Sequence, residues 1–326
     1  MSSRESRKET RKRSSSADGE AASGSEWLTW VAFLLVVVFA GGSPVAVRFS
    51  HSGLPPFWGA TTRFVGAAVI FWIIVLVRGI AVPKGRALVG AVIYGLLSIG
   101  ATSAGFYWGL MRAPAGLAGA MLALVPLLTF FCAWLHGVET FRWQGLMGVL
   151  VATAGILFGV VRGFGGSVHV PSVLALLAGV ACLSEANVVF KLFPKSDPFV
   201  TNAVALTAGT PLLAVLSLLV GERWALPSTF NSWAAYGYLV LIGSVVVFYL
   251  FLRILSAWTP SAAARVFLFI PIATVVIAAW VAGEVITLPF LIGTALVIAG
   301  VLLGSKRSRP ETAGLTCREV PSQATC

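Results

Sequence analysis

Three ionisable side chains lie within long apolar stretches of this 326-residue chain: Arg63, Glu185 and Arg265. A charged side chain at the centre of a membrane helix costs about 2.5–3.5 kcal/mol, and such residues usually mark a pathway or a binding site. A guanidinium there can bind an anion, whereas a carboxylate can bind an amine or carry a proton. These three residues are therefore the first candidates for a site that recognises a small charged solute.

Glu185 and Arg265 lie at similar depths if their apolar stretches are helices. Glu185 comes shortly before Lys191, and Arg265 comes shortly after Pro260. At a rise of 1.5 Å per residue, each is about 8–9 Å from the end of its helix. We interpret the pair either as a functional site, in which Glu185 binds a proton or an amine and Arg265 an anion, or as a purely structural salt bridge.

Arg63 and three uncharged side chains complete the set of substrate-binding candidates. Arg63 lies about 10 Å inside its apolar stretch and either faces a cavity or reaches back to the membrane surface. Tyr107 offers a hydroxyl and Trp108 an indole face for a cation, although both could equally pack between helices or anchor them at the interface. Asn187 carries an amide that must find a partner in an apolar setting.

The composition requires a lipid environment. Hydrophobic residues make up 58% of the chain and charged residues only 11%, where a soluble domain has about 25% charged residues. The mean hydropathy is +0.91. The apolar stretches are continuous and about 20 residues long, which indicates spanning helices rather than the alternating strands of a barrel. We therefore expect an all-α membrane protein.

Ten transmembrane helices are predicted from these stretches. They cover residues 27–47, 56–77, 87–110, 116–135 and 144–161 in the first half, and residues 173–190, 199–220, 233–255, 262–282 and 289–303 in the second. Several tryptophans lie near the ends of the stretches, as expected for anchors at the membrane surface.

The stretch from Pro126 to Gly159 occurs twice. Adding 145 to a residue number in the first copy gives the matching residue of the second. The pairs are Pro126 and Pro271, Thr129 and Thr274, Ala133 and Ala278, Glu139 and Glu284, Gly148 and Gly293, Gly155 and Gly300, and Gly159 and Gly304. A self-match at a fixed offset indicates two copies of one structural unit.

The repeated residues have expected structural roles. Pro126 and Pro271 each remove a helix hydrogen bond, so we expect a kink that acts as a hinge or shapes a cavity. Glu139 and Glu284 should cap the helix that follows each of them. The glycines of the second helix allow close approach between helices, either within the bundle or between two copies of the chain in a homodimer.

The distribution of Lys and Arg predicts how the chain crosses the membrane. Most basic residues fall on the cytoplasmic side if the N-terminus is inside, so both termini should be cytoplasmic in a multi-pass protein of the cell membrane. With five spans in each unit, the second unit enters from the opposite side. The fold prediction is therefore ten helices in two inverted five-helix repeats, an arrangement that supports alternating access.

The repeated motifs resemble the EamA domain, which occurs in tandem in the drug/metabolite transporter superfamily. The resemblance covers residues 27–307 and is carried by 123–126 with Glu139 and Gly155, by 269–271 with Glu284 and Gly300, by Thr62-Arg63-Phe64 and by Gly41-Gly42-Ser43. It implies a secondary carrier with a central cavity that moves small metabolites, often amino acids or related compounds. Arg63 occupies a position where the family leads one to expect an arginine.

These observations give a division of the chain into four parts. We expect a disordered cytoplasmic tail at 1–26, a first EamA repeat at 27–161, a second at 171–305 and a cytoplasmic tail at 306–326. Ten of the 23 basic residues lie in the two tails, which favours a role in membrane topology over binding to nucleic acid.

The predicted function is export of an amino acid or drug-like solute by alternating access. A passive channel or a non-transporting anchor or receptor protein is the alternative, although the short loops leave no soluble domain to present. No histidine has the spacing of a metal site, and neither a phosphate-binding loop nor a catalytic set is present, so we expect no metal, no cofactor and no enzyme activity. Proton coupling through Glu185 stays open.

Overall fold

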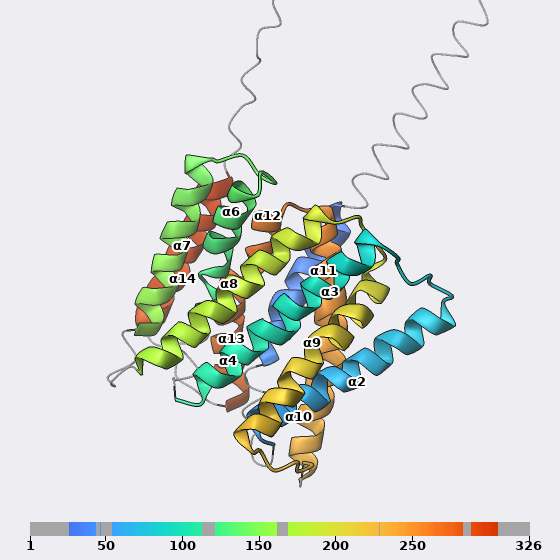
Figure 1. Cartoon of the computed structure of the whole chain (residues 1–326). Helices are drawn as coiled ribbons and strands as arrows, with labels where there is room; N and C mark the ends of the chain where they lie inside the picture. Colours follow the sequence, from blue (N-terminus) through green and yellow to red (C-terminus); the bar gives the residue numbers. More distant parts are fainter. Residues whose placement is uncertain are drawn as a thin grey trace, which may run out of the picture.

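The computed structural model describes residues 26–43, 46, 54–112, 121–161, 169–227, 229–282 and 288–305. Throughout these ranges the regular structure is helical, with no strand, which confirms the predicted all-α class. Seven helices in the described ranges are long and apolar enough to cross a membrane. Figure 1 shows them as a bundle of long, inclined helices.

The helices of the first half follow the order of its apolar stretches. The first helix covers Glu26–Ser43. It is followed by α2 (Pro56–Val77), α3 (Arg86–Gly95), η1 (Leu96–Ala101), α4 (Thr102–Leu110), α6 (Val125–Leu135) and α7 (Trp143–Val161). The helices α3, η1 and α4 run on without a break as one span.

The second half follows the same order. Its helices are α8 (Val170–Leu192), α9 (Pro198–Val220), α10 (Phe230–Val240), η2 (Leu241–Val246), α11 (Val247–Ala257), α12 (Pro260–Ala264), α13 (Val266–Ala282) and α14 (Leu288–Ser305). Proline opens α2, α9 and α12, where its missing N–H costs no hydrogen bond. Gly221 ends α9 with a positive φ of 71°, the conformation that glycine adopts most readily.

The two π-helical segments lie at matching positions. Leu96–Ala101 and Leu241–Val246 each interrupt a long span near its middle, and they are separated by the 145 residues that separate the repeated prolines. A π segment widens the helix by one residue per turn and often marks a functional site. The sequence analysis did not predict either segment.

Helices of the two halves pack in pairs. The closest pairs are α7 with α14, α2 with α9, and α4 with α8. Figure 1 shows α7 (green) and α14 (red) together at one edge of the bundle. Gly300 of α14 meets the backbone of α7 at Gly148 and Ala152, leaving no room for a side chain. The predicted close approach through small residues is therefore confirmed at Gly300, within the bundle.

The apolar interior is shared by both halves. One cluster joins the first helix to α11 and α13, a second joins α2 to α9, and a third joins α6 to α8. Phe57 and Phe71 of α2 are completely buried in the second cluster. Each cluster contains residues from both sequence halves, so neither half has a separate core.

The interruptions of the repeated helices differ between the copies. Pro126 stands at the start of α6, directly after a turn at Ala123 and Leu124. Pro271 lies inside α13, which continues without a break, and the turn in that span falls earlier, at Arg265. Glu284, residues 116–120 of the predicted fourth span and both tails lie outside the described residues.

Candidate functional site

Arg63 lies at the contact between α2 and the π segment η2. Its Nε donates to Ser244 Oγ at 2.7 Å, and its Nη2 donates to the carbonyl oxygen of Gly243 at 2.9 Å. Among the described residues, Arg63 forms no ion pair with a carboxylate. The structure therefore holds a cation inside the bundle whose described partners are all neutral.

Aromatic hydroxyls surround this guanidinium. Tyr107 of α4 and both Tyr236 and Tyr238 of α10 lie close enough to interact with it electrostatically. Ser43, at the end of the first helix, also faces Gly243. We call Arg63, Ser43, Tyr107, Tyr236, Tyr238 and Ser244 the Arg63 cluster. It draws on four spans, of which Tyr107 and Arg63 were predicted site residues.

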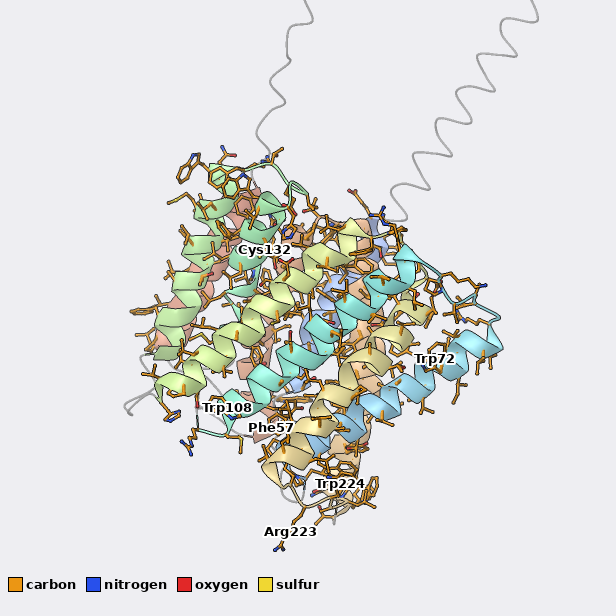
Figure 2. All side chains as sticks on the ribbon, in the orientation of Figure 1. Phe57, Trp72, Trp108, Cys132, Arg223 and Trp224 are labelled. Atoms are coloured by element: carbon orange, nitrogen blue, oxygen red, sulfur yellow. The ribbon has the colours of Figure 1, made fainter. Side chains whose placement is uncertain are left out.

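Tyr107 and Trp108 point to different surroundings although they are adjacent in α4. Tyr107 is half-buried and its ring lies 6.4 Å from that of Phe57 in α2. Trp108 is 43% exposed at the end of α4, where Figure 2 labels it. The indole is thus turned away from the packed interior. This position fits an anchor at the membrane interface better than a contact with substrate.

Glu185 forms its closest charged contact with a histidine. Its Oε1 lies 3.2 Å from His136 Nε2, and the two side chains are 31% and 35% exposed. His136 Nδ1 lies 2.9 Å from the carbonyl oxygen of Cys132, one helical turn earlier. Glu185 and Arg265 form no ion pair, although the structure describes both, so the predicted direct contact is wrong. The alternative, that both face one cavity, stays a prediction.

Arg265 instead interacts electrostatically with Glu139. The Glu139 carboxylate accepts a hydrogen bond from the backbone N–H of Ser261 at 2.9 Å, at the first turn of α12. We predicted that Glu139 caps the helix that follows it, α7, and this is wrong, because the carboxylate caps a helix of the other half. The positive end of that short helix and Arg265 both favour the negative charge.

Asn187 is the least satisfied polar group of the predicted set. It is completely buried in α8, and neither atom of its amide has a hydrogen-bond partner in the described structure. The buried hydroxyls of Ser98, Thr129 and Ser261 also lack partners there, and η1, α6 and α12, which carry them, all contact α8. Buried polar groups without partners are uncommon and often bind water or a ligand.

The predicted residues thus divide into two groups. Arg63 and Tyr107 meet in the Arg63 cluster. Glu185 and Asn187 lie on α8, and Arg265 directly follows α12. His136 lies beside Glu185, and Glu139 beside Arg265. Figure 2 labels Phe57, which contacts Tyr107, toward one end of the bundle and Cys132, beside Glu185, toward the other. No group of three potential ligands for a metal ion occurs among the described residues.

The sequence analysis missed several contributors. The sequence could have indicated three of them, because they are polar residues in an otherwise apolar span: Tyr236, Tyr238 and Ser244. His136 was considered only as a metal ligand, and its spacing in the sequence did not fit that role. Glu222 was overlooked; its carboxylate accepts from the backbone N–H groups of Phe57 and Trp58 at 3.0 and 2.7 Å and so caps α2 from the other half.

A bundle of apolar, membrane-length helices with polar groups inside it defines a multi-pass membrane protein. The profile of the EamA-like transporter family matches the chain twice, over residues 27–161 and 170–305. The chain belongs to this family, and it is therefore a transporter of the drug/metabolite transporter superfamily.

Curated relatives agree with this family. The chain is 23% identical to the uncharacterized inner membrane transporter YedA of Escherichia coli K12, over 83% of this chain and 88% of the relative. It is 28% identical to a probable terminal-alkyne amino-acid exporter of Streptantibioticus cattleyicolor, over 86% and 93%. A protein of known crystal structure, 21% identical, has a TM-score of 0.70 over 85% of this chain and 96% of that one, which supports the fold.

Proposed function

We propose that this protein is a secondary transporter that exports a small organic metabolite, an amino acid or a drug-like solute, by alternating access. The observation that carries this proposal is Arg63: an interior cation at a contact between the two halves, whose partners in the described part of the chain are all neutral. Its burial is costly unless a solute provides the missing charge. The name of the Streptantibioticus relative supports an amino acid and the outward direction.

The mechanism depends on ten spans arranged as two inverted repeats, residues 27–161 and 171–305. Three features support this arrangement: the repeated sequence, the π segments at equivalent positions, and the pairing of α2 with α9 and α7 with α14. If the halves exchange conformations, a site between them opens to one side of the membrane and then to the other. Both termini are cytoplasmic in this proposal.

The substrate binds between the two groups of polar side chains. Arg63 and Tyr107 contact it from one side, and Asn187 and Arg265 line the route from the other. Pro126 and Pro271 lie on the helices that flank this route and shape it. The paired Glu185 and His136 are one-third exposed, so protons can reach them, and they provide the coupling to a proton gradient.

Flux measurements in proteoliposomes test this function. The purified protein is reconstituted, and uptake and counterflow of amino acids and related metabolites are measured with and without a pH gradient. We expect saturable uptake and transient accumulation of labelled solute in exchange for unlabelled solute. Flux that never saturates would identify a passive channel, and absence of flux for every solute would contradict the proposal.

A further inference from the structure

We infer that the Arg63 cluster is a carboxylate subsite, in which the substrate's carboxylate binds the free edge of the Arg63 guanidinium. This inference rests on the proposed transport function and names the chemical class of its substrate. The structure provides three supports: the geometry of the guanidinium, the groups around it and the contrast with the equivalent place in the other half.

The guanidinium uses one of its two edges for the protein. A guanidinium has five N–H donors in a planar fork. Nε and Nη2, which form one edge, bond to Ser244 Oγ and the Gly243 carbonyl. These contacts fix the plane of the group. The Tyr107 hydroxyl lies within reach of the remaining donors, so a ligand carboxylate at the Nη1–Nη2 edge would bind beside that hydroxyl. Two parallel N–H donors match the two oxygens of a carboxylate, so this edge favours bidentate binding.

The surroundings suit one negative charge. The hydroxyls of Tyr107 and Tyr236 can donate to carboxylate oxygens, and both lie close to Arg63. Glu222, the carboxylate nearest to the start of α2, is already bound to the backbone of Phe57 and Trp58 and to Ser217. Within the described residues, the charge of Arg63 is therefore available to a ligand.

The equivalent place in the other half is closed. There the end of α3 and the π segment η1 pack directly on the backbone of α9: a Cβ at Gly95 would collide with Ala205, and one at Gly209 with both Gly95 and Gly100. The segment η2 contacts α2 through the Arg63 side chain instead of through backbone. Of the two π segments, only η2 thus lies beside a side chain, that of Arg63, that can bind an anion.

Ligand-induced thermal stabilisation of the purified full-length protein tests the subsite. The probes are leucine, 4-methylpentanoate, which keeps the carboxylate but lacks the amine, and leucinamide, which lacks the carboxylate. We expect leucine and 4-methylpentanoate to raise the unfolding temperature and leucinamide to leave it unchanged. Stabilisation by leucinamide equal to that by leucine, or no stabilisation by either carboxylate, would overturn the inference.

Variants assign the effect to Arg63. Arg63→Gln should weaken carboxylate binding about ten- to hundredfold, and Arg63→Lys, which keeps the charge but loses the planar edge, should weaken it less. The control is Arg223→Gln, since Figure 2 shows Arg223 pointing away from the bundle. If Arg63→Gln does not fold, Arg63→Lys and Ser244→Ala, which frees Nε, provide the comparison. Unchanged carboxylate binding in the folded variants would contradict the subsite.

The subsite and the transport function can fail separately. Saturable flux of solutes with no preference for a carboxylate would overturn the subsite and leave the transporter in place. Carboxylate binding that depends on Arg63, without any flux, would support the subsite and contradict the proposed function.

Discussion

The polar side chains inside the bundle differ in how completely the protein satisfies them. Arg63 has two neutral partners, Glu185 has an imidazole partner, and the amide of Asn187 has none in the described structure. An unsatisfied buried polar group costs about 1–3 kcal/mol, and Asn187 fits that description most fully. Arg63 keeps its charge in the interior without a carboxylate partner among the described residues, and these two positions carry the proposed site.

Neutralising Glu185 should uncouple transport from the proton gradient. In Glu185→Gln, the side chain at position 185 can no longer bind or release a proton and His136 loses its carboxylate partner, so the response of uptake to an imposed pH gradient should disappear while exchange continues. His136→Gln should have the same effect, and His169→Gln, a histidine on the other end of α8, serves as the control. An unchanged pH response in Glu185→Gln would rule out this carboxylate as the coupling group.

Removing the charge of Glu222 should destabilise the protein. Glu222→Gln weakens two charge-assisted hydrogen bonds at the start of α2, and loss of a helix cap typically costs about 0.5–2 kcal/mol. The thermal unfolding temperature in detergent should fall relative to wild type. Glu26→Gln, at the exposed start of the first helix, should leave it unchanged. Equal unfolding temperatures for wild type and Glu222→Gln would contradict the cap.

The sequence could indicate which residues are unusual but not which residues they meet. Arg63, Glu185 and Arg265 were recognised because a charge in an apolar stretch is costly. Their partners could not be recognised: Ser244 is 181 residues from Arg63, and Glu139 caps a helix 122 residues later. Similar depth in the membrane wrongly suggested a pair, because depth does not specify which faces of two helices meet.

At the scale of helices, the positions of the elements were largely predictable. Most of the described helices begin and end within a few residues of the apolar stretches, because the thickness of the bilayer sets the length of a span. The exception is α6, which begins at Val125, nine residues after the start of the predicted fourth span. The π segments were not predictable, since one extra residue per turn leaves the apolar composition unchanged. The turn at Arg265 was also missed, because Pro271 was expected to interrupt that span.

The contact between η1 and α9 predicts a strong effect of one methyl group. In Gly209→Ala, the new Cβ would collide with the carbonyl of Gly95 and with Ile99 and Gly100 of η1, and overpacking of this kind typically costs about 1–3 kcal/mol. We expect a lower unfolding temperature. Gly237→Ala is the matched control, because a Cβ there meets no atom within 4 Å. Equal stability of both variants would show that the contact is not close.

At the scale of the whole molecule, the proposed topology can be tested directly. Reporter fusions at either terminus should be fluorescent with green fluorescent protein and inactive with alkaline phosphatase, because both termini are expected in the cytoplasm. A fusion in the loop between α9 and α10 should behave in the opposite way. Phosphatase activity at either terminus would contradict the orientation on which the inverted repeats depend.

Alternating access predicts that the two groups of polar residues are reached from opposite sides in turn. Ser43 belongs to the Arg63 cluster, so a cysteine in its place reports on that group. The native Cys132 lies beside Glu185 and reports on the other group. Each serves as the single cysteine of an otherwise cysteine-free protein.

The decisive measurement is the rate of labelling of these two cysteines by a water-soluble, membrane-impermeant maleimide, with and without substrate. If the halves exchange roles, substrate should raise the rate at one position and lower it at the other. Rates that change in the same direction at both positions, or that do not respond to a transported substrate, would contradict alternating access.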